Sequence, residues 1–117
     1  MATQKQFKNF EEMLEASETP LLVDFYADWC GPCRMLAPIL DQVQSMMKHQ
    51  VQVVKIDTER YPNLASKYSV HALPTLVLFK QGDPVERLEG VLPAEDIVNR
   101  LQAVSYTHLT LPTKRIV

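Results

Sequence analysis

The sequence predicts one α/β domain with a mixed β-sheet and helices on both faces of that sheet. A strand, a helix and a second strand follow one another with short connections over residues 21–57, and such a unit favours a parallel strand pair with a helical crossover. Two more strand-like segments, residues 75–80 and 85–89, are separated by a turn sequence, which indicates an antiparallel hairpin. The chain of 117 residues has the length of one ordinary domain.

The first half of the chain predicts a short helix followed by the strand–helix–strand unit. Asn9 precedes an apolar helical stripe, and Glu12 stands three residues after Asn9. This spacing resembles the capping box of helix starts. Residues 21–27 are apolar on both faces of a strand, which is typical of a central parallel strand covered on both sides. Apolar residues return to helical spacing over residues 32–47, and residues 51–57 form the second strand.

The second half predicts a short helix, a hairpin and a closing helix. The short helix spans residues 63–68, and the hairpin turn falls on residues 81–84, Gln-Gly-Asp-Pro. Such turn-forming residues between two apolar runs favour an antiparallel pair. Pro93 suits the first position of the last helix, because proline lacks the N–H that remains unpaired there.

The end of the chain departs from this pattern. The segment of residues 105–113 has neither a helical period nor a clean strand alternation. With Val104 it reads VSYTHLTLPT, which resembles, letter for letter, the translation of a transposase-adapter sequence used in sequencing libraries. We therefore expect a native domain over residues 1–104 and a non-native, disordered tail over residues 105–117, of the kind that is excluded from fold reasoning. The alternative is a genuine flexible tail.

Charge, hydropathy and cysteine content exclude several classes of protein. A formal net charge of −2 gives no electrostatic reason to bind nucleic acid or an anionic membrane. No apolar run approaches the roughly 20 residues of a membrane-spanning helix, and the amino terminus lacks the apolar core of a signal peptide. Two cysteines cannot build a disulfide framework. We therefore expect these cysteines to be important for their chemistry.

Cys30 and Cys33 are expected to form a redox-active pair. They stand where a predicted strand passes into a helix, and residues three apart on a helix share one face. The unpaired N–H groups and partial positive charge of a helix start stabilise an anion, which favours the thiolate of Cys30 and makes it the attacking group. Cys33 lies one turn further in, more shielded, and suits a resolving thiol. The pair would exchange disulfides with a partner through a mixed disulfide.

Asp24 is the candidate acceptor for the proton that Cys33 must lose. It interrupts an otherwise apolar strand, where a buried carboxylate is costly and tends to have a raised pKa. Lys55 is similarly placed in the next strand and is its candidate partner. The alternatives are that Asp24 is a hydrogen-bonded core acid and that Lys55 reaches solvent.

Three other readings of the cysteine pair have less support. A zinc site needs two further ligands, and the histidines, His49, His71 and His108, do not stand at finger spacing. Haem attachment requires a histidine after the second cysteine, where this chain has Arg34. A purely structural disulfide would close a very small loop, which stabilises little.

Several segments together resemble the thioredoxin family over about residues 4–104. They are LVDFYADWCGPCRMLAPIL, VVKIDTE, ALPTLVLFKQG and EG. Two longer segments, KIDTERYPNLASKY and EGVLPAEDIV, are most similar to y-type thioredoxins of plastids and cyanobacteria. The resemblance implies a thioredoxin fold, with a central mixed five-stranded sheet flanked by helices on both faces. It also implies a protein-disulfide reductase that binds no cofactor and works through its own reversible Cys30–Cys33 disulfide.

The resemblance assigns further residues by position. Cys30 and Cys33 match the family's attacking and resolving thiols, and Asp24 and Lys55 match its buried acid and the lysine near it. Pro74 matches a cis-proline that lies against the disulfide. The residues that match the family's apolar surface for partner docking are Trp29, Gly31, Pro32, Leu73, Pro74 and Gly90. Tyr26 and His71 depart from many relatives, which bears on the preference for partners.

The resemblance also implies partners and a location. We expect disulfide-containing targets such as peroxiredoxins, a flavin- or ferredoxin-dependent thioredoxin reductase, and a monomer. A chain that starts at Met1 without a transit peptide is expected in a cyanobacterial cytoplasm, with the plastid stroma as the alternative. Other function classes are a non-catalytic binding subunit and an oxidase or isomerase. The latter usually carry histidine between the cysteines, where this chain has Gly31 and Pro32.

Overall fold

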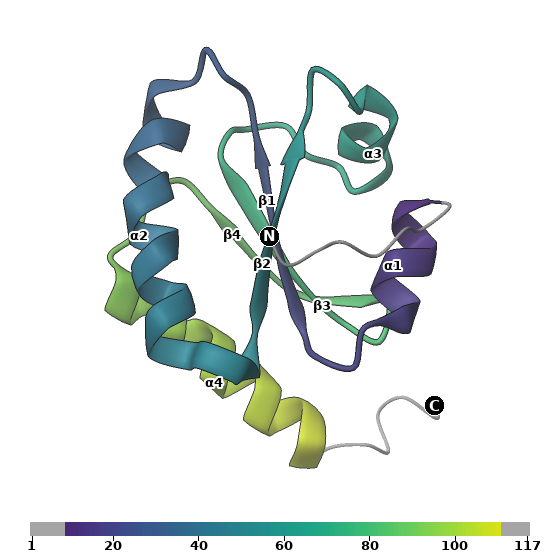
Figure 1. Cartoon of the computed structure of the whole chain (residues 1–117), viewed down its shortest axis with the longest axis vertical. Coiled ribbons are helices and arrows are strands. Elements are labelled where there is room, and N and C mark those ends of the chain that lie inside the picture. The colour runs from purple at the N-terminus through teal and green to yellow at the C-terminus, as the bar shows by residue number, and fades with distance from the viewer. Residues whose placement is uncertain (1–8, 111–117) are drawn as a thin grey trace.

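The computed structural model describes the backbone of residues 9–110 and the side chains of residues 9–104. Its elements follow one another along the chain as α1 (Phe10–Ala16), β1 (Leu21–Tyr26), α2 (Gly31–Met47), the 3₁₀ helix η1 (Lys48–Gln50), β2 (Gln52–Asp57), α3 (Pro62–Lys67), β3 (Thr75–Lys80), β4 (Asp83–Glu89) and α4 (Ala94–Thr110). All the predicted helices and strands of the domain are present (Figure 1).

One mixed sheet has the strand order β2-β1-β3-β4. Strand β1 pairs parallel with β2 and antiparallel with β3, and β3 pairs antiparallel with β4. The predicted crossover and the predicted hairpin are therefore both confirmed. The expected count of five strands is wrong for residues 9–110, where the sheet has four. Within these residues only four segments have strand-like patterning, and each of them is already one of the four strands.

Helices cover both faces of the sheet, as predicted (Figure 1). Helices α2 and α4 pack on one face, around a core that includes Leu22 of β1 and Leu36 of α2. Helices α1 and α3 pack on the other face, where Val23 and Phe25 of β1 are buried. Strand β1 is apolar on both sides because each of its faces lies under a helical layer.

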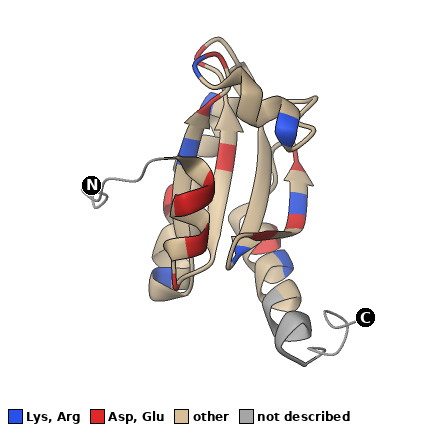
Figure 2. Cartoon of the chain, turned by 90° about the vertical axis from the view of Figure 1, so that its right-hand side faces the viewer, with Lys and Arg blue, Asp and Glu red and all other residues tan. Residues whose placement is uncertain are grey.

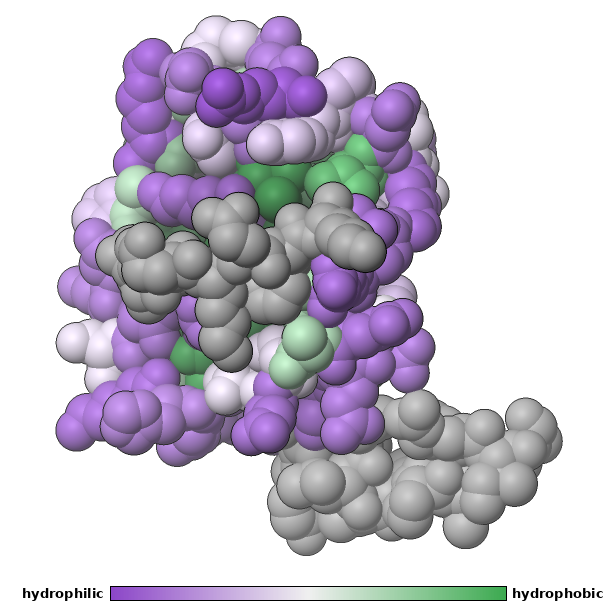
Figure 3. Space-filling view, turned by 45° about the vertical axis from the view of Figure 1, so that its right-hand side comes forward, coloured by the Kyte–Doolittle hydropathy of each residue, from purple (hydrophilic) through white to green (hydrophobic). Residues whose placement is uncertain are grey.

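The drawn surface of the domain is mainly polar, in contrast to its apolar core. Charged residues lie mostly on the helices, the loops and the outer strands (Figure 2). The face drawn in Figure 3 is largely hydrophilic, and its apolar side chains show mainly within hollows. Among the described residues, no helix combines the length and apolar composition needed to cross a bilayer.

The ends of the elements differ from expectation by one or two residues. The predicted cap of α1 is confirmed, because the Oδ1 atom of Asn9 accepts a hydrogen bond of 2.7 Å from the backbone N–H of Glu12. Helix α3 begins and ends one residue earlier than predicted. The hairpin turn is shorter than predicted, because Gln81 and Gly82 adopt φ angles of +53° and +89° and two residues in that region close a tight hairpin.

Helix α4 continues from Ala94 to Thr110 and so passes the expected domain boundary at residue 105. Residues 111–117, which make up the rest of the predicted tail, lie outside the described residues. The boundary at 104/105 and the non-native origin of the tail stay predictions.

Two neighbouring side chains of α2 are expected to contribute very differently to the free energy of unfolding. Leu36 is fully buried, whereas Met35 is 63% exposed. We expect Leu36→Ala to lower the free energy of unfolding by about 3 kcal/mol, because it removes buried surface and leaves a cavity. The matched control Met35→Ala is expected to change it by less than about 0.5 kcal/mol. Urea denaturation of both variants measures the difference, and equal losses would contradict this packing of α2.

Candidate active site

The two cysteines lie at the start of α2 and form a disulfide. Cys30 is the N-cap of the helix, and its Sγ atom accepts a hydrogen bond of 3.2 Å from the backbone N–H of Cys33. The two Cα atoms are 5.3 Å apart, within the usual range for a disulfide. The predicted pairing is confirmed. Both residues are nearly buried, at 4% and 6% exposure, so their exposed fractions do not show Cys33 to be the more shielded in the disulfide form.

The chain between β1 and α2 holds Cys30 in this position. The backbone N–H of Cys30 donates to the carbonyl of Ala27 at 3.1 Å, and the carbonyl of Cys30 accepts from the N–H of Arg34 at 3.3 Å. The Arg34 side chain reaches back and donates to the carbonyl of Asp28 at 2.7 Å. Pro32 lies in the first turn of the helix, where its fixed φ suits the helical backbone.

Asp24 is buried in β1, at 3% exposure, and its Oδ1 atom has no hydrogen-bond partner. Burial raises the pKa of the Asp24 carboxyl to about 6, and the positive charge of Lys55 opposes part of that rise. Lys55 is exposed and stands beside Asp24 in the parallel register of β1 and β2.

Asp24 faces the same side of the sheet as α2. Side chains alternate along a strand, so Asp24 shares a face with Leu22, which packs against Leu36 of α2. Tyr26 is the next residue on that face, and it packs against the small cluster formed by Ala27 and the two cysteines. The carboxyl group therefore lies on the face from which Cys33 approaches the sheet.

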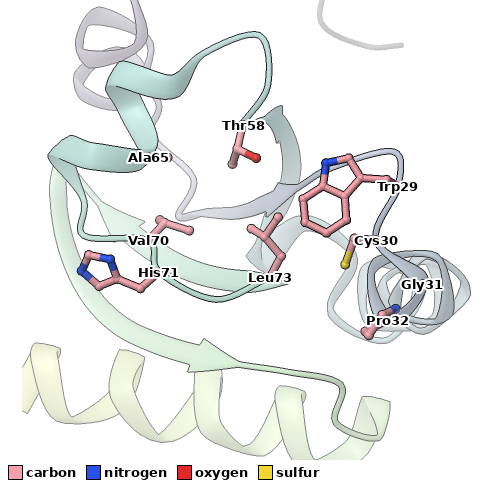
Figure 4. Close-up of a pocket in the computed structure, with 9 residues that line it drawn as sticks. All are labelled: Trp29, Cys30, Gly31, Pro32, Thr58, Ala65, Val70, His71 and Leu73. Atoms are coloured by element: carbon pink, nitrogen blue, oxygen red, sulfur yellow. The ribbon is translucent and has the colours of Figure 1, made fainter.

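A groove of about 520 Å³ runs from the cysteine pair toward the loop before β3 (Figure 4). It is lined by Trp29, Cys30, Gly31, Pro32, Thr58, Ala65, Val70, His71 and Leu73. The Trp29 ring lies beside Cys30, while His71 lies at the far end of the groove (Figure 4). Four of the predicted docking residues line this groove, and Cys33 is not among its lining residues.

Pro74 and Gly90 do not line the groove, but they are joined to each other. The peptide bond between Leu73 and Pro74 is cis, as the resemblance implied. Pro74 is buried, and its carbonyl accepts a hydrogen bond of 2.9 Å from the N–H of Gly90. Gly90 has a φ of +88°, a conformation that favours glycine. The Leu73 side chain packs against the cysteine cluster and so links Pro74 to the disulfide region.

Several lining residues escaped the sequence analysis. Thr58, Ala65 and Val70 line the groove, and no spacing in the sequence singles them out. Glu59 was missed as well: its Oε2 atom accepts a hydrogen bond of 2.8 Å from the indole Nε1–H of Trp29, which is 67% exposed. The only available signal was that loops at the carboxyl ends of the parallel strands β1 and β2 meet at one edge of a sheet.

Among the side chains of residues 9–104, no three histidine, cysteine, aspartate or glutamate groups gather closely enough to hold a metal ion. The redox group that the structure presents is the chain's own Cys30–Cys33 disulfide.

Comparison with known proteins gives a consistent result. The thioredoxin family model matches residues 2–103. A thioredoxin-like protein of Synechocystis sp. is 61% identical over 102 residues, which are 87% of this chain and 97% of that protein. Chloroplastic thioredoxin Y1 of Arabidopsis thaliana is 50% identical over 101 residues, which are 86% of this chain. The chain spans 59% of the length of that plastid protein.

The fold comparison agrees with the sequence comparison. The crystal structure of chloroplastic thioredoxin z is similar with a TM-score of 0.72 at 40% identity, over 80% of this chain and 84% of that one. The predicted likeness to the y-type proteins of cyanobacteria and plastids is confirmed by these relatives.

The buried carboxyl of Asp24 predicts how stability depends on pH. The pKa is about 6 in the folded chain against an ordinary value of 3.8, so the folded state binds more protons than the unfolded state between these values. The contribution of Asp24 to stability is therefore largest at low pH and is lost as the pH rises through the folded pKa. The shift corresponds to a loss of about 3 kcal/mol between about pH 4 and about pH 7.

Urea denaturation of the oxidised protein across this pH range measures the effect. The matched variant Asp24→Asn lacks the titrating group, so we expect its excess stability over the parent chain to grow as the pH rises. A difference between the two proteins that does not change with pH would contradict the raised pKa.

Proposed function

The chain belongs to the thioredoxin family of thiol-disulfide oxidoreductases, and we propose that it reduces partner disulfides with Cys30 as the attacking thiol and Cys33 as the resolving thiol. The observation that carries this order of attack is the position of Cys30 at the N-cap of α2, with a backbone N–H directed at its sulfur. Cys30 also lines the groove where a partner would lie, and Cys33 does not.

The helix start favours the thiolate of Cys30 once the disulfide is reduced. The N–H of Cys33 can donate to a sulfur anion as it donates to the disulfide sulfur. Together with the partial positive charge of the helix N-terminus, it stabilises the negative charge of the Cys30 sulfur, and the thiolate is the nucleophile in disulfide exchange.

The proposed reaction cycle consists of two thiol–disulfide exchanges. The Cys30 thiolate attacks one sulfur of the partner disulfide, forms a mixed disulfide and releases the other partner sulfur as a thiolate, which takes up a proton. Cys33 then loses its proton and attacks Cys30, which closes the Cys30–Cys33 disulfide and releases the second partner thiol. Two electrons have passed from the chain to the partner, and a reductase must return them.

Asp24 is the proposed acceptor of the Cys33 proton, with Lys55 as its electrostatic partner. A carboxyl group with a pKa of about 6 is mostly ionised at neutral pH and can take up a proton without a large energetic cost. Its unpaired Oδ1 atom on the α2 face of the sheet leaves an acceptor free for a proton or a water molecule.

The groove is the proposed docking surface for the partner chain. Trp29, Gly31 and Pro32 form one side of it and Leu73 lies on the other, while Pro74 and Gly90 support the Leu73 side. These residues present apolar surface and backbone next to Cys30, which suits an extended segment that carries a disulfide.

The proposed partners follow from the relatives. We propose peroxiredoxins among the targets and a flavin- or ferredoxin-dependent reductase as the electron source, with the chain acting as a monomer. Its relatives occur in Synechocystis and in chloroplasts, which supports a cyanobacterial cytoplasm or, as the alternative, the plastid stroma.

Reduction of insulin disulfides tests the proposed reaction. We expect the reduced protein to be active, and we expect both Cys30→Ser and Cys33→Ser to abolish turnover. Cys33→Ser is also expected to accumulate a mixed disulfide with insulin through Cys30, detectable by non-reducing electrophoresis and mass spectrometry. An inactive parent chain would reject the proposed function, and a mixed disulfide trapped by Cys30→Ser instead would reverse the order of attack.

The role of Asp24 predicts a step-specific defect. Asp24→Asn should slow the resolving attack roughly tenfold to a hundredfold, because Cys33 loses its proton acceptor. Mixed-disulfide formation, measured in the Cys33→Ser background with and without Asp24→Asn, should be the same. Rapid-quench measurements separate the two steps. Unchanged turnover in Asp24→Asn would remove this residue from the mechanism.

A further inference from the structure

The far wall of the groove is a loop without regular secondary structure. Residues 68–74 connect α3 to β3, and Val70, His71 and Leu73 from this loop line the groove opposite Trp29 (Figure 4). A docking surface built on a loop is only as well defined as the contacts that hold the loop in place.

The first N–H groups of the loop donate to carbonyls of α3. Ser69 has a φ of +56°, and its N–H donates to the carbonyl of Ser66 at 3.1 Å, while the N–H of Val70 donates to the carbonyl of Ala65 at 2.8 Å. The carbonyls of Tyr68 and Ser69 take no part in these bonds. They accept hydrogen bonds from a residue of the sheet.

That residue is Arg87 of β4. Its Nη2 atom donates to the carbonyl of Tyr68, and its Nη1 atom donates to the carbonyl of Ser69 at 3.3 Å. Arg87 stands opposite Val77 in the β3–β4 register, and Val77 is buried on the sheet face that α1 and α3 cover. The side chain therefore crosses from the edge strand to the loop on the same face.

Both ends of the loop are fixed, but by bonds of different kinds. At the β3 end, the Thr75 hydroxyl donates to the carbonyl of Ala72 at 2.6 Å. At the α3 end, a guanidinium group binds two successive carbonyls. Hydrogen bonds from a charged donor are about twice as strong as neutral ones, and arginine, unlike lysine, presents its donors in a rigid planar fork.

We propose that Arg87 is a positioning residue for target recognition: it fixes the loop that forms the far wall of the groove. This inference rests on the proposed function of the groove. Arg87 lines no part of the groove and stands on a different element from the cysteines, so it does not take part in the thiol chemistry. Loss of its two hydrogen bonds should impair reactions that need the far wall and spare those that need only Cys30.

Two disulfide substrates separate these effects. Insulin is a protein target that must lie in the groove, whereas bis(2-hydroxyethyl) disulfide is small and uncharged and needs only the thiolate. We expect Arg87→Met to lower the rate constant for single-turnover reduction of insulin about tenfold, as expected for a loss of about 1.4 kcal/mol. The rate with the small disulfide should stay within about twofold of the parent value, because no bond to the cysteines has changed.

Two further variants complete the design. Arg87→Lys keeps the charge but cannot bind both carbonyls in a fixed geometry, so the insulin rate should recover only in part. The matched control is Arg100→Met: Arg100 is a half-exposed arginine that binds Glu86 of β4 and belongs to α4, which packs on the sheet face opposite to the loop. We expect Arg100→Met to leave both rates within about twofold.

Hydrogen exchange provides a readout that does not depend on activity. The backbone amides of residues 70–73 should exchange faster in Arg87→Met than in the parent chain or in Arg100→Met, while amides of β1 and β3 stay protected. Unchanged exchange at residues 70–73, or an insulin rate equal to that of the parent, would overturn the proposal.

The remaining outcomes also decide the question. Equal losses with both substrates, or faster exchange throughout the sheet, would show a general effect on the fold and overturn the positioning role. A parent chain that reduces the small disulfide but not insulin would overturn the proposed function and this inference together. An active parent with an unaffected Arg87→Met would overturn this inference alone.

Discussion

The position of Cys30 at the first turn of α2 is the constraint on which the rest of the structure depends. A sulfur at that point receives a backbone N–H and the positive end of a helix of 17 residues. This requires that β1 deliver the chain to the edge of the sheet and that α2 pack firmly back across it. The buried Leu36, one turn beyond Cys33, is part of the core that holds α2 there. The reactive end of the helix is thus fixed by contacts that are not themselves reactive.

Asp24 shows that this arrangement has an energetic cost. A side chain of the same size without an ionisable group would destabilise the folded state less in the middle of β1, because an unpaired buried carboxyl loses its hydration. Its neighbours Leu22 and Val23 fill the two cores without such a cost. A polar group retained in that position is typical of functional sites, where local stability is sacrificed for chemistry.

Most of the fold could be predicted because its signals are local. The two apolar faces of β1, the helical spacing of α2 and the turn at Gly82 each follow from short-range patterns, and each is confirmed. The number of strands could not be predicted in the same way: the expected five came from a resemblance, while the described residues hold four. The equal burial of Cys30 and Cys33 also escaped prediction, because burial depends on segments such as the one around Leu73 that pack against the pair from elsewhere in the chain.

Without the family resemblance, which assigned Leu73, Pro74 and Gly90, the docking surface was predictable only where one short segment contains it. The run from Trp29 to Cys33 is contiguous, but the contacts from Glu59 to Trp29 and from Arg87 to Ser69 join residues that are 30 and 18 positions apart. No spacing rule detects a side chain that reaches a distant carbonyl, since the pairing exists only after the sheet has formed. Such supporting contacts are therefore the part of the site that a structure adds.

The location of Trp29 has an optical consequence. It is the single tryptophan of the chain, its ring lies beside Cys30 (Figure 4), and its N–H is bound to Glu59. The tryptophan emission of the protein therefore originates at the reacting centre, so a change in the oxidation state of the pair takes place directly beside its single indole.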